Sequence, residues 1–171
     1  KIIPVVKQHN FELILKLHTK KSTKRNDGNK WREDVYKELM SPHHVSRIIQ
    51  RFEEDDRLGM VGPQGHIISM TKYWGSNRRR VLKLASDMGI SGNRASTQPF
   101  VAGTMFFARL SAIRPIEELG LTDMDFEVEA GQTDGTMAHV VERLFSIALI
   151  ATNQELIGSD SQAFLNDINT N

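Results

Sequence analysis

Short apolar runs alternate along this chain of 171 residues with segments in which apolar side chains recur every three or four positions. Short runs are typical of buried strands, and the longer spacing is typical of helices that bury one face. We expect strands at 13–18, 58–63 and 100–108, and helices at 31–39, 42–52, 77–88, 111–119 and from 133 onward. This alternation predicts a mixed α/β fold.

One domain is expected over residues 1–158, because this length is usual for a single domain with its own core. Residues 159–171 are polar and rich in asparagine, which is typical of a disordered tail. The sequence contains no cysteine, which excludes disulfide frameworks, thiolate zinc sites and cysteine nucleophiles.

Positive and negative charges are separated along the chain, although the net charge is only +1. Residues 1–32 carry nine basic and two acidic side chains, whereas residues 115–171 carry one basic and eleven acidic side chains. This asymmetry indicates an anionic partner near the front, attraction between the two ends, or both. A nucleic-acid partner is not expected, because the rear is acidic and no RNA-binding motif with interleaved aromatic residues is present.

The first polar cluster follows the first expected strand and consists of His18, Thr19, Lys20 and Lys21. Ligands of open α/β sheets bind beyond the carboxyl ends of strands. Two lysines, a hydroxyl group and an imidazole suit a phosphate or diphosphate, because they combine positive charge with hydrogen-bond donors. The alternative is a solvated basic loop in which His18 caps the strand end.

Gly103 interrupts the apolar run at 100–108. A glycine inside a strand usually marks a bulge or a close approach of the backbone to another group. The pattern therefore predicts either a substrate-binding wall at Gly103 and Thr104 or an ordinary core strand with a bulge.

Acidic residues alternate with other residues in segment 123–129. In a strand, this alternation places four carboxylates on one side: Asp123, Asp125, Glu127 and Glu129. Such a row suits a divalent cation, or it forms the solvated edge of a sheet, which is the commoner case.

Asp134 lies at the start of the last expected helix, where a carboxylate either caps backbone N–H groups or serves as a general base. His139, Glu142 and Arg143 follow at helical spacing, so we expect them on the polar side of that helix. From spacing alone, a capping Asp134 and a surface pair of Glu142 with Arg143 are the simpler interpretation.

Four segments carry a family pattern: "LKLHTKKS", "LGMVGP", "FVAGTMFFAR" and "DFEVEAGQTDGTMAHVVERLF". Taken in order, they resemble the rhamnan-synthesis protein F family over roughly residues 13–145. Members of this family occur in bacterial polysaccharide, O-antigen and cell-wall rhamnan pathways and are regarded as glycosyltransferases. The resemblance implies a GT-A-like mixed sheet flanked by helices, and we expect the N-terminal nucleotide-binding portion to lie outside this chain.

The resemblance also implies a donor site at His18, Thr19, Lys20 and Lys21. These residues would bind the diphosphate of a nucleotide sugar, for which dTDP-rhamnose is one candidate donor. Their segment stands where GT-A enzymes carry an Asp-x-Asp metal motif, so we assign no metal ligand. Lysines can neutralise a leaving diphosphate in place of a metal, so we expect transfer with little or no dependence on a divalent cation.

The acceptor side is implied by the later segments, with Gly103, Thr104 and Arg143 as substrate-binding residues. An inverting transfer needs a carboxylate to take the proton of the acceptor hydroxyl. Asp134 is the first choice for this base and Glu129 the second, with His139 as the third member of the catalytic group. The acceptor is expected to be an oligosaccharide or a lipid-linked glycan.

The resemblance places the protein in the cytoplasm, with peripheral association at the inner face of the plasma membrane as an option. The alternative is a non-catalytic module that binds carbohydrate or a partner within a larger assembly protein. The two differ in their ligands, because a transferase binds a nucleotide sugar whereas such a module binds oligosaccharide and ignores the nucleotide. The oligomeric state is not predicted.

Overall fold

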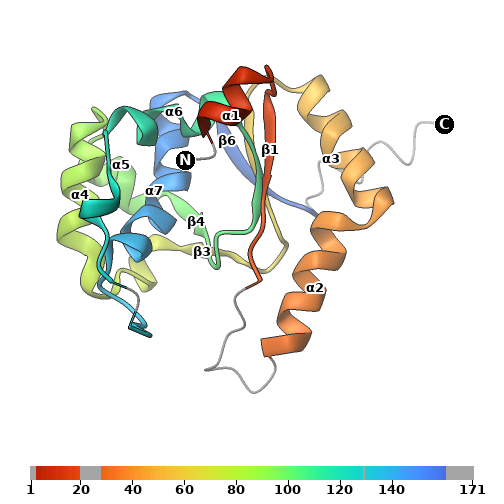
Figure 1. The fold of residues 1–171 in the computed structure, drawn as a ribbon. Coiled ribbons are helices and arrows are strands. Elements are labelled where there is room, and N and C mark those ends of the chain that lie inside the picture. Colours follow the sequence, from red (N-terminus) through yellow and green to blue (C-terminus); the bar gives the residue numbers. More distant parts are fainter. Residues whose placement is uncertain (1–2, 20–27, 129, 161–171) are drawn as a thin grey trace.

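The computed structural model describes residues 3–19, 28–128 and 130–160. A central sheet of short strands lies between two groups of helices, with α2 and α3 on one side and α4, α5, α6 and α7 on the other (Figure 1). The expected mixed α/β architecture is therefore confirmed.

The central sheet has the strand order β1-β5-β2-β6. Its strands are β1 (Leu13–Lys16), β5 (Phe106–Arg109), β2 (Leu58–Gly62) and β6 (Glu155–Gly158). Neighbouring strands are antiparallel except β2 and β6, which are parallel. Lys16 lies opposite Phe106, so the carboxyl end of β1 lies beside the start of β5.

Helices α2 (Gly28–Met40) and α3 (Pro42–Glu54) cover one face of the sheet. Helix α3 begins at Pro42, as expected, and Ser41 in extended conformation is its N-cap residue. Their apolar faces meet alternate residues of the strands, since successive strand side chains point to opposite faces. The resulting core cluster contains Val35, Leu39, Ile48, Phe52, Leu58, Val61, Met105 and Phe107.

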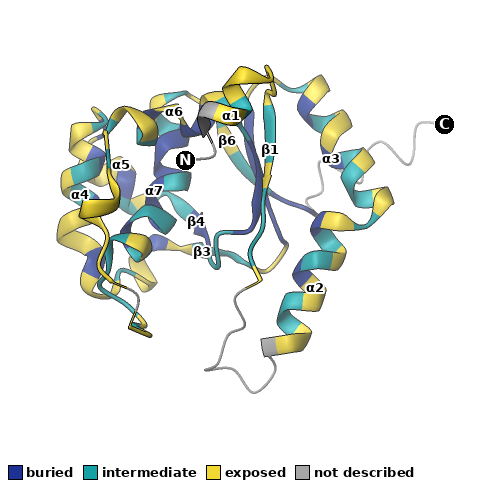
Figure 2. Cartoon of the chain, in the orientation of Figure 1, coloured by how far each residue is buried: buried dark blue, intermediate teal, exposed yellow. Residues whose placement is uncertain are grey.

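The other face is covered by α4 (Arg78–Asp87), α5 (Gly92–Thr97), α6 (Leu110–Glu118) and α7 (Met137–Ala151). Met60, Phe106 and Ala108 of the strands pack here against α6 and α7. A two-stranded antiparallel sheet of β3 (Ile67–Ser69) and β4 (Pro99–Val101) lies beside α7. Figure 2 shows the buried residues concentrated in the strands and on the helix faces that pack against them.

The remaining elements are short. Helix α1 (Ile3–Gln8) is joined to α6 by an ion pair in which Lys7 Nζ lies 2.7 Å from Glu117 Oε2. Three 3-10 turns, η1 (Met70–Lys72), η2 (Gly75–Asn77) and η3 (Asp123–Asp125), connect the larger elements.

The single strand expected at 100–108 is wrong, because this run forms β4 and β5 in two different sheets. The turn between them contains two consecutive residues with positive φ, Gly103 at 84° and Thr104 at 51°. Glycine adopts such angles without a steric cost, and this allows the chain to leave one sheet and enter the other.

The strand expected at 123–129 is also wrong in the residues described. Asp123–Asp125 form a 3-10 turn, in which the Asp125 carboxylate accepts hydrogen bonds from the N–H and hydroxyl of Thr122. The carboxylates therefore do not form a row on one side of a strand. The following helix begins at Met137 rather than Thr133, after Gly135 with φ of 80°.

The expected polar tail falls mostly outside the described residues. Ser159 lies inside them and is buried, with its hydroxyl donating to Glu38 Oε2 at 2.5 Å and accepting from the Gln64 N–H at 3.0 Å.

Candidate functional site

A cleft of about 370 Å³ opens where the carboxyl end of β1, the β4–β5 turn and the first turns of α7 meet. Its outer part is formed by the α6–α7 segment, described over 119–128 and 130–136. Four of the predicted site residues line it, namely His18, Gly103, Thr104 and His139. The other lining residues are Phe126, Glu127, Gln132, Thr136, Ala138 and Glu142.

Gly103 connects two sides of the cleft through its backbone. Its carbonyl oxygen accepts a hydrogen bond from His18 Nε2 at 2.5 Å, and its N–H donates to Glu142 Oε1 at 2.7 Å. A β-carbon at this position would lie only 3.0 Å from the Trp31 ring, and the φ of 84° also favours glycine. The expected close approach of the backbone at Gly103 is therefore found, with Trp31 as the close neighbour.

His18 is held in place from two directions. Besides the bond to Gly103, the carbonyl oxygen of His18 accepts a hydrogen bond from the Tyr36 hydroxyl of α2 at 2.8 Å. The Nε2 atom must carry a proton to donate to Gly103, which leaves Nδ1 as an acceptor in the neutral ring. That Nδ1 atom is buried and has no hydrogen-bond partner in the part of the chain described.

His139 lies in the first turns of α7, and its ring is oriented by a neighbour. Its Nδ1 atom is hydrogen-bonded to the Thr136 hydroxyl at 2.6 Å, and both residues line the cleft. The contact orients the imidazole of His139 within the lining of the cleft.

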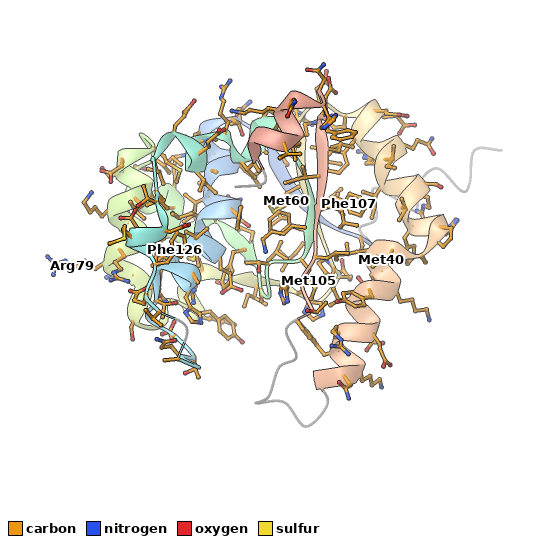
Figure 3. The ribbon with its side chains drawn as sticks, viewed as in Figure 1. Met40, Met60, Arg79, Met105, Phe107 and Phe126 are labelled. Atoms are coloured by element: carbon orange, nitrogen blue, oxygen red, sulfur yellow. The ribbon has the colours of Figure 1, made fainter. Side chains whose placement is uncertain are left out.

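The α6–α7 segment is fixed by Glu127. Its Oε1 accepts from Arg80 Nη1 at 2.6 Å and its Oε2 accepts from the N–H of Met137 at 2.7 Å. The hydrogen bond from the Met137 backbone and the one from Arg80 lower the pKa of Glu127 to about 2. These bonds hold the segment that carries Phe126 against α4 and α7 (Figure 3).

Asp134 lies outside the set of lining residues. Its Oδ2 accepts from the N–H of Ser76 at 2.7 Å, and its Oδ1 accepts from the side-chain amide of the buried Asn77. Desolvation raises the pKa of Asp134, but the hydrogen bonds from Ser76 and Asn77 outweigh it and lower the net pKa. These contacts favour the role of Asp134 as a cap over its role as a general base. Asp134 caps the turn that leads into α4, however, and not the start of α7. Its role as a base stays a prediction.

Arg143 is buried, so the expectation that it forms a pair with Glu142 on the surface is wrong. Its guanidinium donates to the carbonyl oxygens of Tyr73 and His139, and it stacks over the Phe100 ring at 5.0 Å. The carbonyl oxygens of Tyr73, which follows η1, and of His139 in α7 satisfy the buried charge.

The structure thus brings together part of the predicted site. Thr19 does not line the cleft, and its carbonyl oxygen accepts a hydrogen bond from Arg32 at 3.3 Å. Lys20, Lys21 and Glu129 lie outside the described residues. Six of the lining residues are not in the predicted site: Phe126, Glu127, Gln132, Thr136, Ala138 and Glu142. The sequence places Glu142 at helical spacing from His139, but as half of a surface pair with Arg143. Thr136 stands three residues before His139, so the same spacing could have indicated it.

A second hollow of about 490 Å³ lies at the opposite end of the β1–β5 pair and includes Lys7, Phe11 and Arg109. Its cations already have partners, since Lys7 pairs with Glu117 and Arg109 donates to the carbonyl oxygen of Leu58 at 2.9 Å. It contains none of the predicted site residues.

Within the residues described, no group of three histidine, aspartate or glutamate side chains is placed to hold a metal ion. Across the same residues, none of the helices combines the length and the apolar character that a membrane span requires.

Comparison with known proteins gives a family match and two relatives. The family model described as rhamnan synthesis protein F matches residues 4–155. Two curated proteins from two strains of Xanthomonas campestris pv. campestris, both named uncharacterized protein WxcX, are 40% identical over 140 residues. The match covers 82% of this chain and 20% of each relative, so the chain spans about a fifth of their length. No solved structure is significantly similar.

Proposed function

Because this chain belongs to the rhamnan synthesis protein F family, we propose that it is part of a glycosyltransferase that builds a bacterial surface polysaccharide. The family itself supports a role in rhamnan or polysaccharide synthesis. The proposed reaction moves a sugar from a nucleotide-sugar donor to an oligosaccharide or lipid-linked glycan, and the proposed fold relationship is to the GT-A type.

One observation carries this proposal. His18, Gly103 and His139 come from segments far apart in the sequence, and all three line one cleft. The sequence pattern around each of the three predicts a binding or catalytic role. Chance would not readily bring residues from three such clusters to one cavity of about 370 Å³.

The chemistry of the lining suits a sugar. Imidazole, hydroxyl and amide groups both donate and accept hydrogen bonds, as sugar hydroxyls require. Phe126 and Ala138 add apolar surface on the same cleft, which matches the usual mixture of apolar walls and a few polar groups in small-molecule sites. We place the transferred sugar in this cleft, with the diphosphate toward the carboxyl end of β1.

A specific observation favours the alternative, a module that binds carbohydrate without transferring it. The described lining of the cleft includes histidines and glutamates but no lysine or arginine. A leaving diphosphate needs positive charge, and Lys20 and Lys21, which would provide it, lie outside the described residues. Binding of the nucleotide therefore distinguishes the glycosyltransferase from the carbohydrate-binding module.

A thermal-shift panel tests the proposal. We expect a nucleotide sugar with a UDP, GDP or dTDP carrier to raise the melting temperature, because a ligand that binds only the folded state stabilises it. Stabilisation by oligosaccharide alone, with no response to any nucleotide sugar, would support the binding module instead.

The variant His18→Ala locates the ligand. Loss of its hydrogen bonds should weaken binding about tenfold. His43→Ala is the matched control, because His43 is an exposed histidine on α3 and does not line the cleft. Equal affinity of both variants for the nucleotide sugar would show that the ligand does not bind in this cleft.

A further inference from the structure

The carboxylates near the cleft differ in how many of their oxygen atoms are already hydrogen-bonded. Both oxygens of Glu127 accept strong hydrogen bonds, one from Arg80 and one from Met137. Both oxygens of Asp134 are bonded as well, to Ser76 and Asn77, and Asp134 does not line the cleft. A carboxylate whose lone pairs are committed in this way is a weak proton acceptor.

Glu142 is different. Its Oε1 accepts the N–H of Gly103 at 2.7 Å, but its Oε2 accepts no hydrogen bond from the described residues. Arg143 Nη1 lies 3.7 Å from Oε2, which is beyond hydrogen-bond distance. The side chain is 18% exposed and lines the cleft, so one oxygen is held in place while the other remains available to a ligand.

Two cations compensate the charge of Glu142. Arg143 is buried beneath it and fixed by carbonyl groups. Lys16 is half-buried and donates to the carbonyl oxygen of Thr104 at 3.0 Å, and burial lowers its pKa while the charge of Glu142 partly opposes this. The carboxylate is therefore embedded in a network of fixed groups instead of lying on the solvated side of α7.

We propose that Glu142 is the catalytic base of the transfer, an inference that rests on the proposed function. The acceptor hydroxyl oxygen forms a bond to the anomeric carbon of the donor sugar. The bond from that carbon to the diphosphate oxygen breaks, and its electron pair leaves with the nucleoside diphosphate. The hydroxyl proton moves to Oε2 of Glu142, so no further reactant is needed.

The same geometry assigns a role to Gly103. Its N–H holds Oε1 and so directs Oε2 to one position in the cleft, one turn of α7 away from His139. A base within hydrogen-bond reach of the hydroxyl contributes through this positioning as well as through proton transfer.

The test compares Glu142→Gln with Glu53→Gln in the whole protein. Glutamine keeps an oxygen that can accept the Gly103 N–H but cannot take the proton. Glu53 is an exposed glutamate on α3 and serves as the control. We expect Glu142→Gln to lower the transfer rate by about a hundredfold or more, while its melting temperature and its thermal response to the nucleotide sugar stay close to those of the control.

Other outcomes overturn this inference. Transfer by Glu142→Gln within about threefold of the control shows that Glu142 is not the base, and leaves the proposed function intact. Absence of transfer and of nucleotide-sugar binding in the unmutated protein instead removes the proposed function and this inference with it.

Glu142→Asp covers the case in which the glutamine variant does not fold. Aspartate retains a proton acceptor at a shorter reach, so we expect this variant to transfer the sugar measurably but more slowly than the unmutated protein. Glu142→Ala keeps no acceptor and should transfer at least about tenfold more slowly than Glu142→Asp. Equal transfer rates for the aspartate and alanine variants would assign Glu142 a structural role only.

Discussion

Gly103 orients two side chains of the cleft with its backbone alone, because His18 binds its carbonyl oxygen and Glu142 binds its N–H. Both contacts are made by backbone atoms, so they depend on the backbone conformation at this position. The residue is also confined by the Trp31 ring and by its φ of 84°. The conformation of one glycine thus determines the distance between two walls of the site.

Gly103→Ala should therefore destabilise the protein and impair the cleft. A left-handed conformation costs a non-glycine residue about 1–2 kcal/mol, and the contact of the new β-carbon with Trp31 adds to this. Gly89→Ala is the matched control, because Gly89 has a φ of 75° but nothing within 4 Å of an added β-carbon. Urea unfolding of both variants measures the difference, and equal losses of stability would argue against the Trp31 contact.

Asp134 yields a second prediction at this scale. Asp134→Ala removes acceptors from the Ser76 N–H and the Asn77 amide, so we expect a loss of about 0.5–2 kcal/mol in the free energy of unfolding. Asp134→Asn should keep most of the transfer activity if the residue is a cap. An asparagine variant that melts normally but transfers no sugar would restore Asp134 as the base.

At the scale of elements, the α6–α7 segment is joined to two helices by the carboxylate of Glu127. The Arg80 bond links it to α4, and the Met137 bond links it to the start of α7. Because the segment carries Phe126 and Gln132 into the cleft, its attachment influences the shape of the site.

This attachment predicts a dependence of stability on pH. The folded pKa of Glu127 is about 2, below its ordinary value of 4.5, so its contribution is present above pH 4.5 and is lost as the pH falls toward 2. Denaturant unfolding of the unmutated protein and of Glu127→Gln across this range should show a shallower dependence in the variant. Glu53→Gln is the control, and identical slopes for the three proteins would contradict the prediction.

The elements that could be predicted from the sequence are those with strong local signals. Helix α3 follows from Ser41 and Pro42, and α7 follows from its apolar stripe. Strand β6 and helix α5 were not predicted, because four and six residues carry too little periodicity. The division of 100–108 into β4 and β5 depends on which sheet each half joins, which local pattern does not reveal.

The site was predictable to a similar extent. His18 and His139 stand out in the sequence as imidazoles beside a strand end and a helix start. The bond from Gly103 to Glu142 spans 39 residues, so only the fold brings the carboxylate to the turn. The burial of Arg143 was not predicted for a related reason, since one of its partners is the carbonyl oxygen of Tyr73, 70 residues earlier in the chain.

For the whole molecule, the separation of charge along the sequence is partly cancelled by folding. Lys7 of the basic front pairs with Glu117 of the acidic rear, and Arg80 pairs with Glu127. Attraction between the two ends, one of the expected meanings of the charge pattern, is therefore present in the structure. Exposed pairs of this kind add little stability individually, so their effect is mainly on how the rear of the chain is oriented.

The two hydrogen bonds of Gly103 also connect the walls of the cleft mechanically. Its N–H and its carbonyl group belong to adjacent peptide units that share one α-carbon, so a rotation of the turn displaces His18 and Glu142 together. Insertions or deletions in the β4–β5 turn should accordingly lower stability and ligand binding far more than insertions or deletions of the same length in loops at the opposite end of the sheet.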